Sequence, residues 1–148
     1  MRRRAVVLFG LALAAGCTKG PQGPTLEPVA TDSVQDQEAT FQVDVSWRRV
    51  ATREAQIVVK MTTVGIEQTD KLVVDVKSTG FVITEGVPDW MGFIRPREKY
   101  SHQVSYKLLD DEDSGRIDVS IRRSLDSTLL WSTELLFDAS GGQITLAQ

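Results

Sequence analysis

The stretch YSHQVSYKLLDDEDSGRIDVSIRR, residues 100–123, decides the fold of this chain because it contains two strand patterns and the turn between them. Residues 100, 102, 104, 106 and 108 are aromatic, aliphatic or histidine, and the residues between them are polar. The same alternation returns at Ile117, Val119 and Ile121. A period of two predicts strands with one face on a core and the other in water. The polar residues 110–115 predict a hairpin loop between the two strands.

The period of two continues over most of the chain after residue 40. No window shows a sustained period of 3.6, so we expect no helix of ordinary length. The sequence therefore predicts an all-β protein, a two-sheet antiparallel β-sandwich of about seven strands in one domain over residues 41–148. The further strand patterns cover residues 41–47, 57–61, 72–76, 81–84 and 129–137, with a short last strand at 144–146.

Three stretches between residues 55 and 123 carry a resemblance to a known family. They read AQIVVKMTTVG at 55–65, KLVVDVKSTGFVITEG at 71–86 and FIRPREKYSHQVSYKLLDDEDSGRIDVSIRR at 93–123. In their order of strands, turns and loops they resemble the immunoglobulin-like sandwiches of bacterial envelope proteins, including the CARDB type. The resemblance is one of pattern. It implies an immunoglobulin-like fold and implies no catalytic residue.

The beginning of the chain has the plan of a secretory signal. Arg2, Arg3 and Arg4 precede an apolar run over residues 5–15, which is shorter than the roughly 20 apolar residues of a membrane-spanning helix. The motif LAAGC at 13–17 resembles the lipobox of bacterial lipoproteins, with alanine at the position that is usually larger and apolar. The resemblance implies a lipoprotein signal peptide at 1–16 and lipid on Cys17. An ordinary secretory signal with an incidental cysteine is the alternative.

Residues 17–40 are predicted to be the lipidated Cys17 and a flexible tether. Pro21, Pro24 and Pro28 lie here with almost no large apolar side chain, and such a composition cannot bury a core. Cys17 is the only cysteine, so the mature chain is expected to have no disulfide and no cysteine nucleophile. In lipoproteins of the enteric type an aspartate directly after the lipidated cysteine retains the protein in the inner membrane. The resemblance therefore implies that Thr18 favours the periplasmic face of the bacterial outer membrane, with the inner membrane and the cell surface left open.

The charge of the chain bears on its partners. The formal net charge is −3, and three of the 17 basic residues belong to the predicted signal, so the mature chain is more acidic still. An acidic body disfavours nucleic acid and anionic lipid as partners. We therefore expect attachment to the membrane through the lipid on Cys17 and contacts with other envelope proteins.

Residues with catalytic potential are few. His102 is the single histidine, and its place in an alternating pattern predicts a strand residue. No G-x-S-x-G or H-E-x-x-H motif surrounds any serine or glutamate. The sequence therefore predicts a protein that is not an enzyme and has no cofactor.

Residues 110–115, which we call the acidic loop, are the one candidate for a metal site in the sequence. Asp110, Glu112 and Ser114 fall at the first, third and fifth places of a calcium-loop spacing. The twelfth place, where a bidentate glutamate is needed, holds Ile121, and strands rather than helices flank the loop. We favour a solvated loop, with calcium as the alternative.

Residues 87–97 have the composition of a contact site, with aromatic and aliphatic side chains beside arginines. If the segment contacts a partner, Trp90, Met91, Arg95 and Arg97 are the binding residues, and Phe93 and Ile94 point inward. The alternative is that Trp90, Phe93 and Ile94 together plug one end of the sandwich.

Two functions are compatible with these patterns. The first is a lipid-anchored, non-enzymatic structural or adaptor subunit of a bacterial cell-envelope complex, serving secretion, motility or outer-membrane assembly. The second is a module that recognises glycan, peptidoglycan or calcium through loops at one end of the sandwich.

Overall fold

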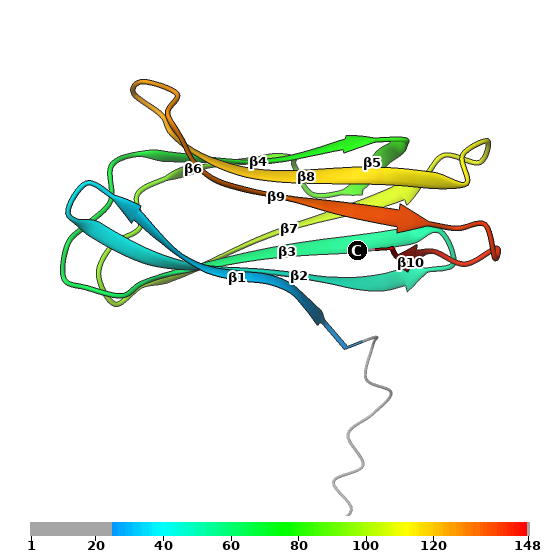
Figure 1. Ribbon diagram of the computed structural model, residues 1–148, viewed down its shortest axis with the longest axis horizontal. Coiled ribbons are helices and arrows are strands. Elements are labelled where there is room, and N and C mark those ends of the chain that lie inside the picture. The colour runs from blue at the N-terminus through cyan, green and yellow to red at the C-terminus, as the bar shows by residue number, and fades with distance from the viewer. Residues whose placement is uncertain (1–24, 148) are drawn as a thin grey trace, which may run out of the picture.

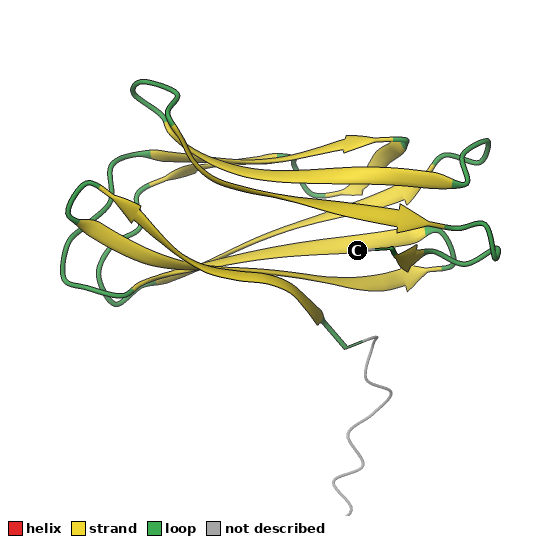
Figure 2. Ribbon diagram, viewed as in Figure 1, coloured by secondary structure: helices red, strands yellow, loops and turns green. Residues whose placement is uncertain are grey.

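The structure, a computed structural model that describes residues 25–147, consists of two antiparallel five-stranded sheets packed face to face (Figures 1 and 2). Figure 2 shows only strands and loops in this part of the chain. The predicted all-β, two-sheet sandwich is thereby confirmed, with ten strands rather than about seven. The first sheet has the order β1 (Glu27–Asp36), β2 (Ala39–Ala51), β3 (Glu54–Thr63), β7 (Lys99–Leu108) and β5 (Phe81–Glu85). The second has the order β10 (Thr145–Leu146), β9 (Leu129–Asp138), β8 (Ser114–Arg123), β4 (Leu72–Thr79) and β6 (Asp89–Gly92).

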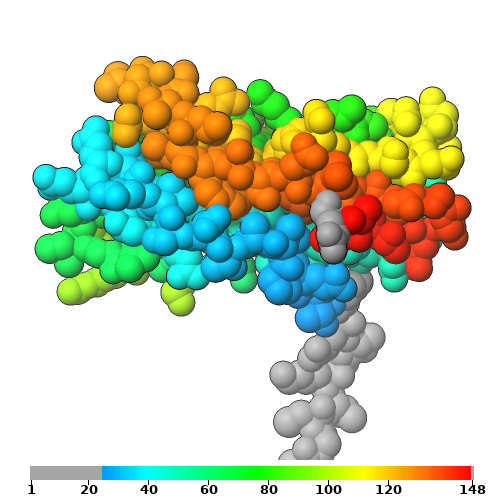
Figure 3. Space-filling view, viewed as in Figure 1, coloured from blue at the N-terminus to red at the C-terminus, as the bar shows by residue number. Residues whose placement is uncertain are grey.

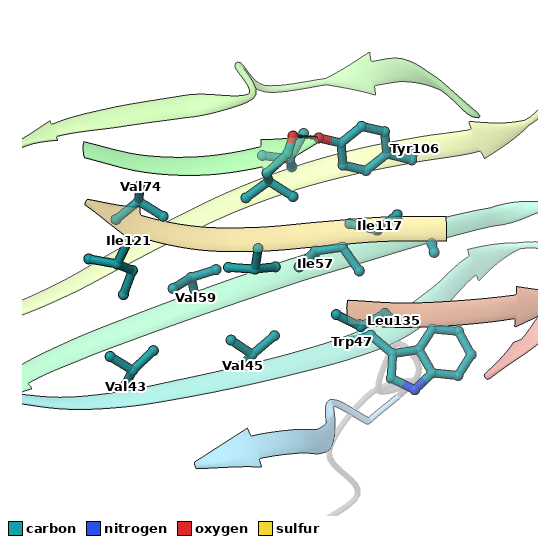
Figure 4. Close-up of a cluster of buried hydrophobic side chains, with 14 of the residues drawn as sticks. Val43, Val45, Trp47, Ile57, Val59, Val74, Tyr106, Ile117, Ile121 and Leu135 are labelled. Carbon is teal, nitrogen blue, oxygen red and sulfur yellow. Dashed lines mark hydrogen bonds between the residues drawn. The ribbon is translucent and has the colours of Figure 1, made fainter. Parts of the chain in front are cut away.

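The core lies between the sheets and follows directly from the period of two. Val43 and Val45 of β2 are fully buried, while Gln42 between the same strand's inward residues is exposed. Ile117 and Ile121 of β8 face them from the other sheet and are also fully buried (Figure 4). Burying a side chain of this size stabilises a fold by about 1.5–3 kcal/mol. The alternating pattern is therefore the main source of stability.

The acidic loop is not a hairpin, contrary to the prediction. β7 pairs with β3 and β5 in the first sheet, whereas β8 pairs with β4 and β9 in the second. The loop between them carries the chain across from one sheet to the other. The alternation in residues 100–123 reports which side chains face the core, and it holds equally well for strands that face each other across that core. It cannot distinguish the two arrangements.

The predicted boundary between tether and domain at residue 41 is wrong for the described part of that stretch. Residues 27–36 form β1, which pairs with β2 along its length. Its polar composition suits an edge strand, and Pro28 can be accommodated there because an edge needs fewer backbone donors. Only Val34 and Asp36 are buried on β1, so its own sequence shows almost no core pattern. Cys17 and the predicted signal lie outside the described residues.

The loops gather at two opposite ends of the sandwich. We call the far end the group of loops at the left of Figure 1, namely residues 36–39, 63–71, 93–98 and 123–128. The loops after β2, β4, β7 and β9 form the other end. The first described residue, Thr25, lines a cleft with Trp47 and β10. β1 runs from there to the far end over ten residues, roughly 30 Å.

Candidate functional site

The acidic loop, which connects β7 of the first sheet with β8 of the second, is held in place by Arg53. The Nη2 of Arg53 donates hydrogen bonds to the backbone carbonyls of Leu109 and Glu112, both at 2.6 Å. Lys107 and Asp110 form an exposed ion pair at 3.9 Å. Within residues 25–147, no group of three or more His, Cys, Asp and Glu side chains is placed to hold a metal ion. The loop carbonyls therefore already have a guanidinium as their partner.

His102 points into the core, as its place in the alternating pattern predicts. It is 8% exposed, and its Nε2 has no hydrogen-bond partner among the described residues. Burial lowers the pKa of the imidazole, and the Val87 carbonyl and the Asp89 carboxylate oppose part of that effect. Val87 lies in the connection from β5 to β6, and Asp89 is the first residue of β6. The histidine is thus covered by the segment that precedes the predicted contact residues.

The predicted contact segment is divided between the core and the surface. Trp90 of β6 lies opposite Val74 of β4 and packs on the ring of Tyr100 of β7, with ring centroids 5.5 Å apart and planes at 59°. Its indole is half-buried against the core. Gly92 leaves room for this ring, since a Cβ there would lie 2.9 Å from Trp90 Cζ2. Trp90 therefore joins the two sheets at their edge.

Of Trp90, Phe93 and Ile94, which the sequence offers as side chains that close one end of the sandwich, only Ile94 lies fully inside it. It is fully buried, and its backbone is held on both sides by Thr69. The Ile94 N–H donates to Thr69 Oγ1 at 2.9 Å, and the Thr69 N–H donates to the Ile94 carbonyl at 3.1 Å. Phe93 is 41% exposed and Met91 is 52% exposed. The expected inward orientation of Phe93 is wrong, and Trp90, which is expected to be exposed in a contact segment, is half-buried. Met91 is exposed and Ile94 is buried, as expected.

Arg95 and Arg97 are exposed, and neither guanidinium forms an ion pair with a residue in the described range. Their backbone is fixed by Thr63, whose Oγ1 donates to the Arg95 carbonyl at 3.3 Å and accepts from the Arg97 N–H at 3.2 Å. We call Trp90, Met91, Phe93, Arg95 and Arg97 the contact patch. It combines a fixed backbone with exposed apolar and cationic side chains.

A small cleft of about 280 Å³ opens within the contact patch. Three further residues line it, namely Gly92, Glu98 and Tyr100. Tyr100 Oη donates to Glu98 Oε2 at 2.6 Å and accepts from the Arg95 N–H at 3.2 Å. Burial and the nearby Glu98 carboxylate raise the pKa of Tyr100. The sequence pattern does not mark Tyr100 or Glu98 as site residues. Tyr100 reads as an ordinary core-facing strand residue, and only the approach of β6 to β7 turns it into a cleft wall.

Comparison of the sequence with models of protein families and with curated proteins finds no match in either. Within residues 25–147, no helix is long and apolar enough to cross a membrane.

Proposed function

We propose that this chain is a lipid-anchored, non-enzymatic adaptor of the bacterial cell envelope that docks on a partner protein through the contact patch. One observation carries the proposal: Met91 and Phe93 expose large apolar side chains on a segment whose backbone is fixed by Ile94, Thr69 and Thr63. Exposed apolar side chains on a rigid frame lose little conformational entropy on binding, which is the property of an interface hot spot. Arg95 adds a side chain type enriched in hot spots.

The anchoring part of the proposal is supported by the lipobox-like motif that ends at Cys17. Because β1 begins at Glu27, residues 18–26 are the longest possible tether, and they span at most about 30 Å. The proposed domain therefore stays within one domain diameter of the membrane. A partner protein must therefore reach the domain close to the membrane surface.

We also infer that the sandwich belongs to the immunoglobulin-like class. The support is the course of the chain from β4 to β7, which alternates between the second sheet and the first at each step. Such crossings between sheets are typical of immunoglobulin-like sandwiches.

The docking proposal is tested by a photo-crosslinking amino acid placed at position 91 in the full chain in its native membrane. Leu136 of β9 is a matched control because it is 42% exposed and lies outside the contact patch. We expect a discrete adduct from position 91, its loss on Arg95→Glu, and no such adduct from position 136. Equal adducts from both positions, or none from position 91, would contradict the proposal. Palmitate labelling of Cys17→Ser, expected to be lost completely, tests the anchor separately.

The cleft within the contact patch favours glycan recognition as a second candidate. Trp90 and Tyr100 offer aromatic surfaces, and Arg95 and Glu98 offer polar groups beside them. Aromatic faces and a few convergent polar groups are the usual lining of small-molecule sites. Titration of the full chain with soluble peptidoglycan fragments, followed by tryptophan fluorescence, tests this candidate. Saturable quenching that is absent in Trp90→Phe supports it, and an unchanged spectrum excludes it.

A further inference from the structure

We propose that three loops of the far end, other than residues 93–98 of the contact patch, carry a second docking face, which binds a protein surface that presents a basic side chain beside apolar ones. The proposal goes beyond the adaptor function and does not depend on the contact patch. The face is formed by the tips of three loops: Gln37 and Glu38, then Val64, Ile66 and Glu67, then Leu125 and Ser127.

The apolar part of this face consists of the three most exposed large hydrophobic side chains in the described range. Leu125 is 91% exposed, Ile66 is 83% exposed and Val64 is 64% exposed. All three lie on loop tips of the same end, where nothing in the strand pattern requires an apolar residue. Figure 3 shows the β8–β9 loop, in orange, and the β1–β2 turn, in cyan, both projecting at this end. Exposed apolar side chains gathered in one region mark interaction sites.

The loops that carry these side chains are tied together rather than free. Asp36 is 2% exposed and accepts from Arg123 Nε at 2.9 Å, while Arg123 Nη1 donates to Asp126 at 3.0 Å. The Asp70 N–H donates to Asp36 Oδ2 at 3.2 Å, and the Ser124 N–H donates to the Lys71 carbonyl at 2.8 Å. These bonds join the β1–β2, β3–β4 and β8–β9 loops into one frame. The face is thus organised before a partner arrives, which favours binding.

The charge of a hollow between two of these loops indicates which side chains a partner must present. A hollow of about 330 Å³ lies between the β1–β2 turn and the β3–β4 loop, and its walls include four carboxylates: Asp36, Glu38, Glu67 and Asp70. Arg123 pairs with Asp36 and Asp70. The ion pairs within residues 25–147 include neither Glu38 nor Glu67. The hollow therefore has uncompensated negative charge next to Ile66, and a lysine or arginine side chain complements it.

Backbone conformations that favour glycine are occupied by polar residues on two of these loops. Of the three residues other than glycine with positive φ in the described range, Gln37 at 56° and Ser127 at 58° lie on loops of this face, and Arg97 at 64° belongs to the contact patch. Glycine adopts this region without the steric conflict of a Cβ. Gln37 and Ser127 thus keep polar side chains around the apolar tips at positions where glycine would fit the backbone better.

A bilayer is the other surface that exposed apolar tips could meet, and the same charges disfavour it. Anionic lipid would be repelled by Glu38 and Glu67, and the chain as a whole is acidic. The far end also lies opposite the part of the sandwich where Thr25 meets Trp47 and β10. A face that points away from the start of the described chain is placed to meet another protein.

The test uses two synthetic peptides with the same apolar residues, one with lysines and the other with glutamates at the charged positions. Each is titrated into the full ¹⁵N-labelled chain in detergent micelles, and binding is followed by NMR. We expect the lysine peptide to shift the amide signals of residues 36–39, 64–70 and 124–128. It should bind at least tenfold more tightly than the glutamate peptide. In the variant Glu38→Lys/Glu67→Lys the preference should reverse.

The apolar tips are tested with Leu125→Ser, which should weaken binding of the lysine peptide about tenfold. Leu136→Ser, an exposed leucine outside the far end, should leave it unchanged. The proposal is overturned if neither peptide binds at millimolar concentration, if the charge reversal has no effect, or if the shifts map to the contact patch. It is also overturned if phosphatidylglycerol vesicles bind the full chain in a Leu125-dependent manner, since the occupant would then be a membrane. Arg95→Glu should not change peptide binding, which separates this face from the contact patch.

Discussion

At the scale of single residues, two buried titratable side chains set how this domain responds to pH. Tyr106 of β7 donates a hydrogen bond from its hydroxyl to the carbonyl of Val76 of β4, and so links the two sheets through the core (Figure 4). His102, four residues earlier on the same strand, is buried, and its Nε2 has no hydrogen-bond partner within residues 25–147. One group opposes ionisation at high pH and the other at low pH.

The first prediction concerns Tyr106 in alkali. Burial raises its pKa to about 12 from the ordinary value of 10.0. The unfolded chain therefore ionises this tyrosine first, and stability is full below pH 10 and falls as the pH rises toward 12. The loss is about 2–3 kcal/mol. Urea unfolding at pH 9 and pH 11.5 should show this fall in the wild type and a smaller one in Tyr106→Phe, which cannot ionise. The same fall in both would contradict the role of Tyr106.

The second prediction concerns His102 in mild acid. Burial holds its folded-state pKa below 6.5, so the unfolded chain takes up the proton first. Stability is therefore full above pH 6.5 and decreases as the pH falls through the folded-state pKa. Because His102 is the single histidine, ¹H NMR of its ring follows one titration directly. Thermal melting from pH 7.5 to 5 should decline more steeply in the wild type than in His102→Gln. Parallel declines would exclude this histidine as the cause.

At the scale of elements, β1 contacts both sheets although few of its side chains are apolar and buried. It covers the edge of β2 and also contacts β9 of the opposite sheet, where Trp131 Nε1 donates to Asp32 Oδ2 at 2.9 Å. It also delivers Asp36 to Arg123. A strand with few apolar residues thus closes one side of the sandwich.

The third prediction is that a chain beginning at residue 41 is much less stable than one beginning at residue 25. Loss of β1 exposes the edge of β2 and leaves Arg123 without its buried partner. Circular dichroism melts of the two truncated chains provide the comparison. The single change Asp32→Ala should cost only about 0.5–1.5 kcal/mol, the value of one hydrogen bond. Equal melting of the two truncations would show that β1 is dispensable.

At the scale of the whole molecule, the two sheets are joined by a few polar contacts in addition to the apolar core. Among the ion pairs of the described residues, that of Asp36 and Arg123 is the most buried, with side chains 0% and 16% exposed. It connects the end of β1 in the first sheet with the end of β8 in the second. The frame of the far end therefore depends on one ion pair between sheets.

The fourth prediction is that replacing one member of this pair lowers the free energy of unfolding, and that replacing both members with apolar residues lowers it less than the two single changes together. Asp36→Asn should destabilise the fold because Arg123 loses its most buried partner, but by less than the loss of an only partner would, since Asp70 and Asp126 still pair with the guanidinium. Asp36→Leu with Arg123→Met should cost clearly less than the sum of the single changes. Chemical unfolding of the wild type, Asp36→Leu, Arg123→Met and the double variant gives the coupling energy. Additive effects would mean that the two side chains act independently.

Much of the candidate site was not predictable from the sequence. For a contact segment the composition of residues 87–97 predicts that Trp90 and Met91 are exposed; Met91 is exposed, whereas Trp90 is half-buried. It does not reveal that Phe93 faces outward, because residues 90–94 contain no polar residue whose alternation with apolar ones would assign a side. Nor can it reveal the pairing of Trp90 with Tyr100 or of Asp36 with Arg123, whose partners are distant in the chain.

The sequence by itself determined that this protein is all-β, where most of its strands lie and which side chains form the core. These are local properties, because a period of two assigns each side chain to one face of its own strand. The tertiary structure alone decided that β7 and β8 belong to different sheets and that the polar residues 27–36 form a strand. It also placed the apolar tips of Ile66 and Leu125 at the same end. The physical reason is that strand pairing and loop placement depend on contacts between distant segments, whose free energy is not encoded in any single stretch.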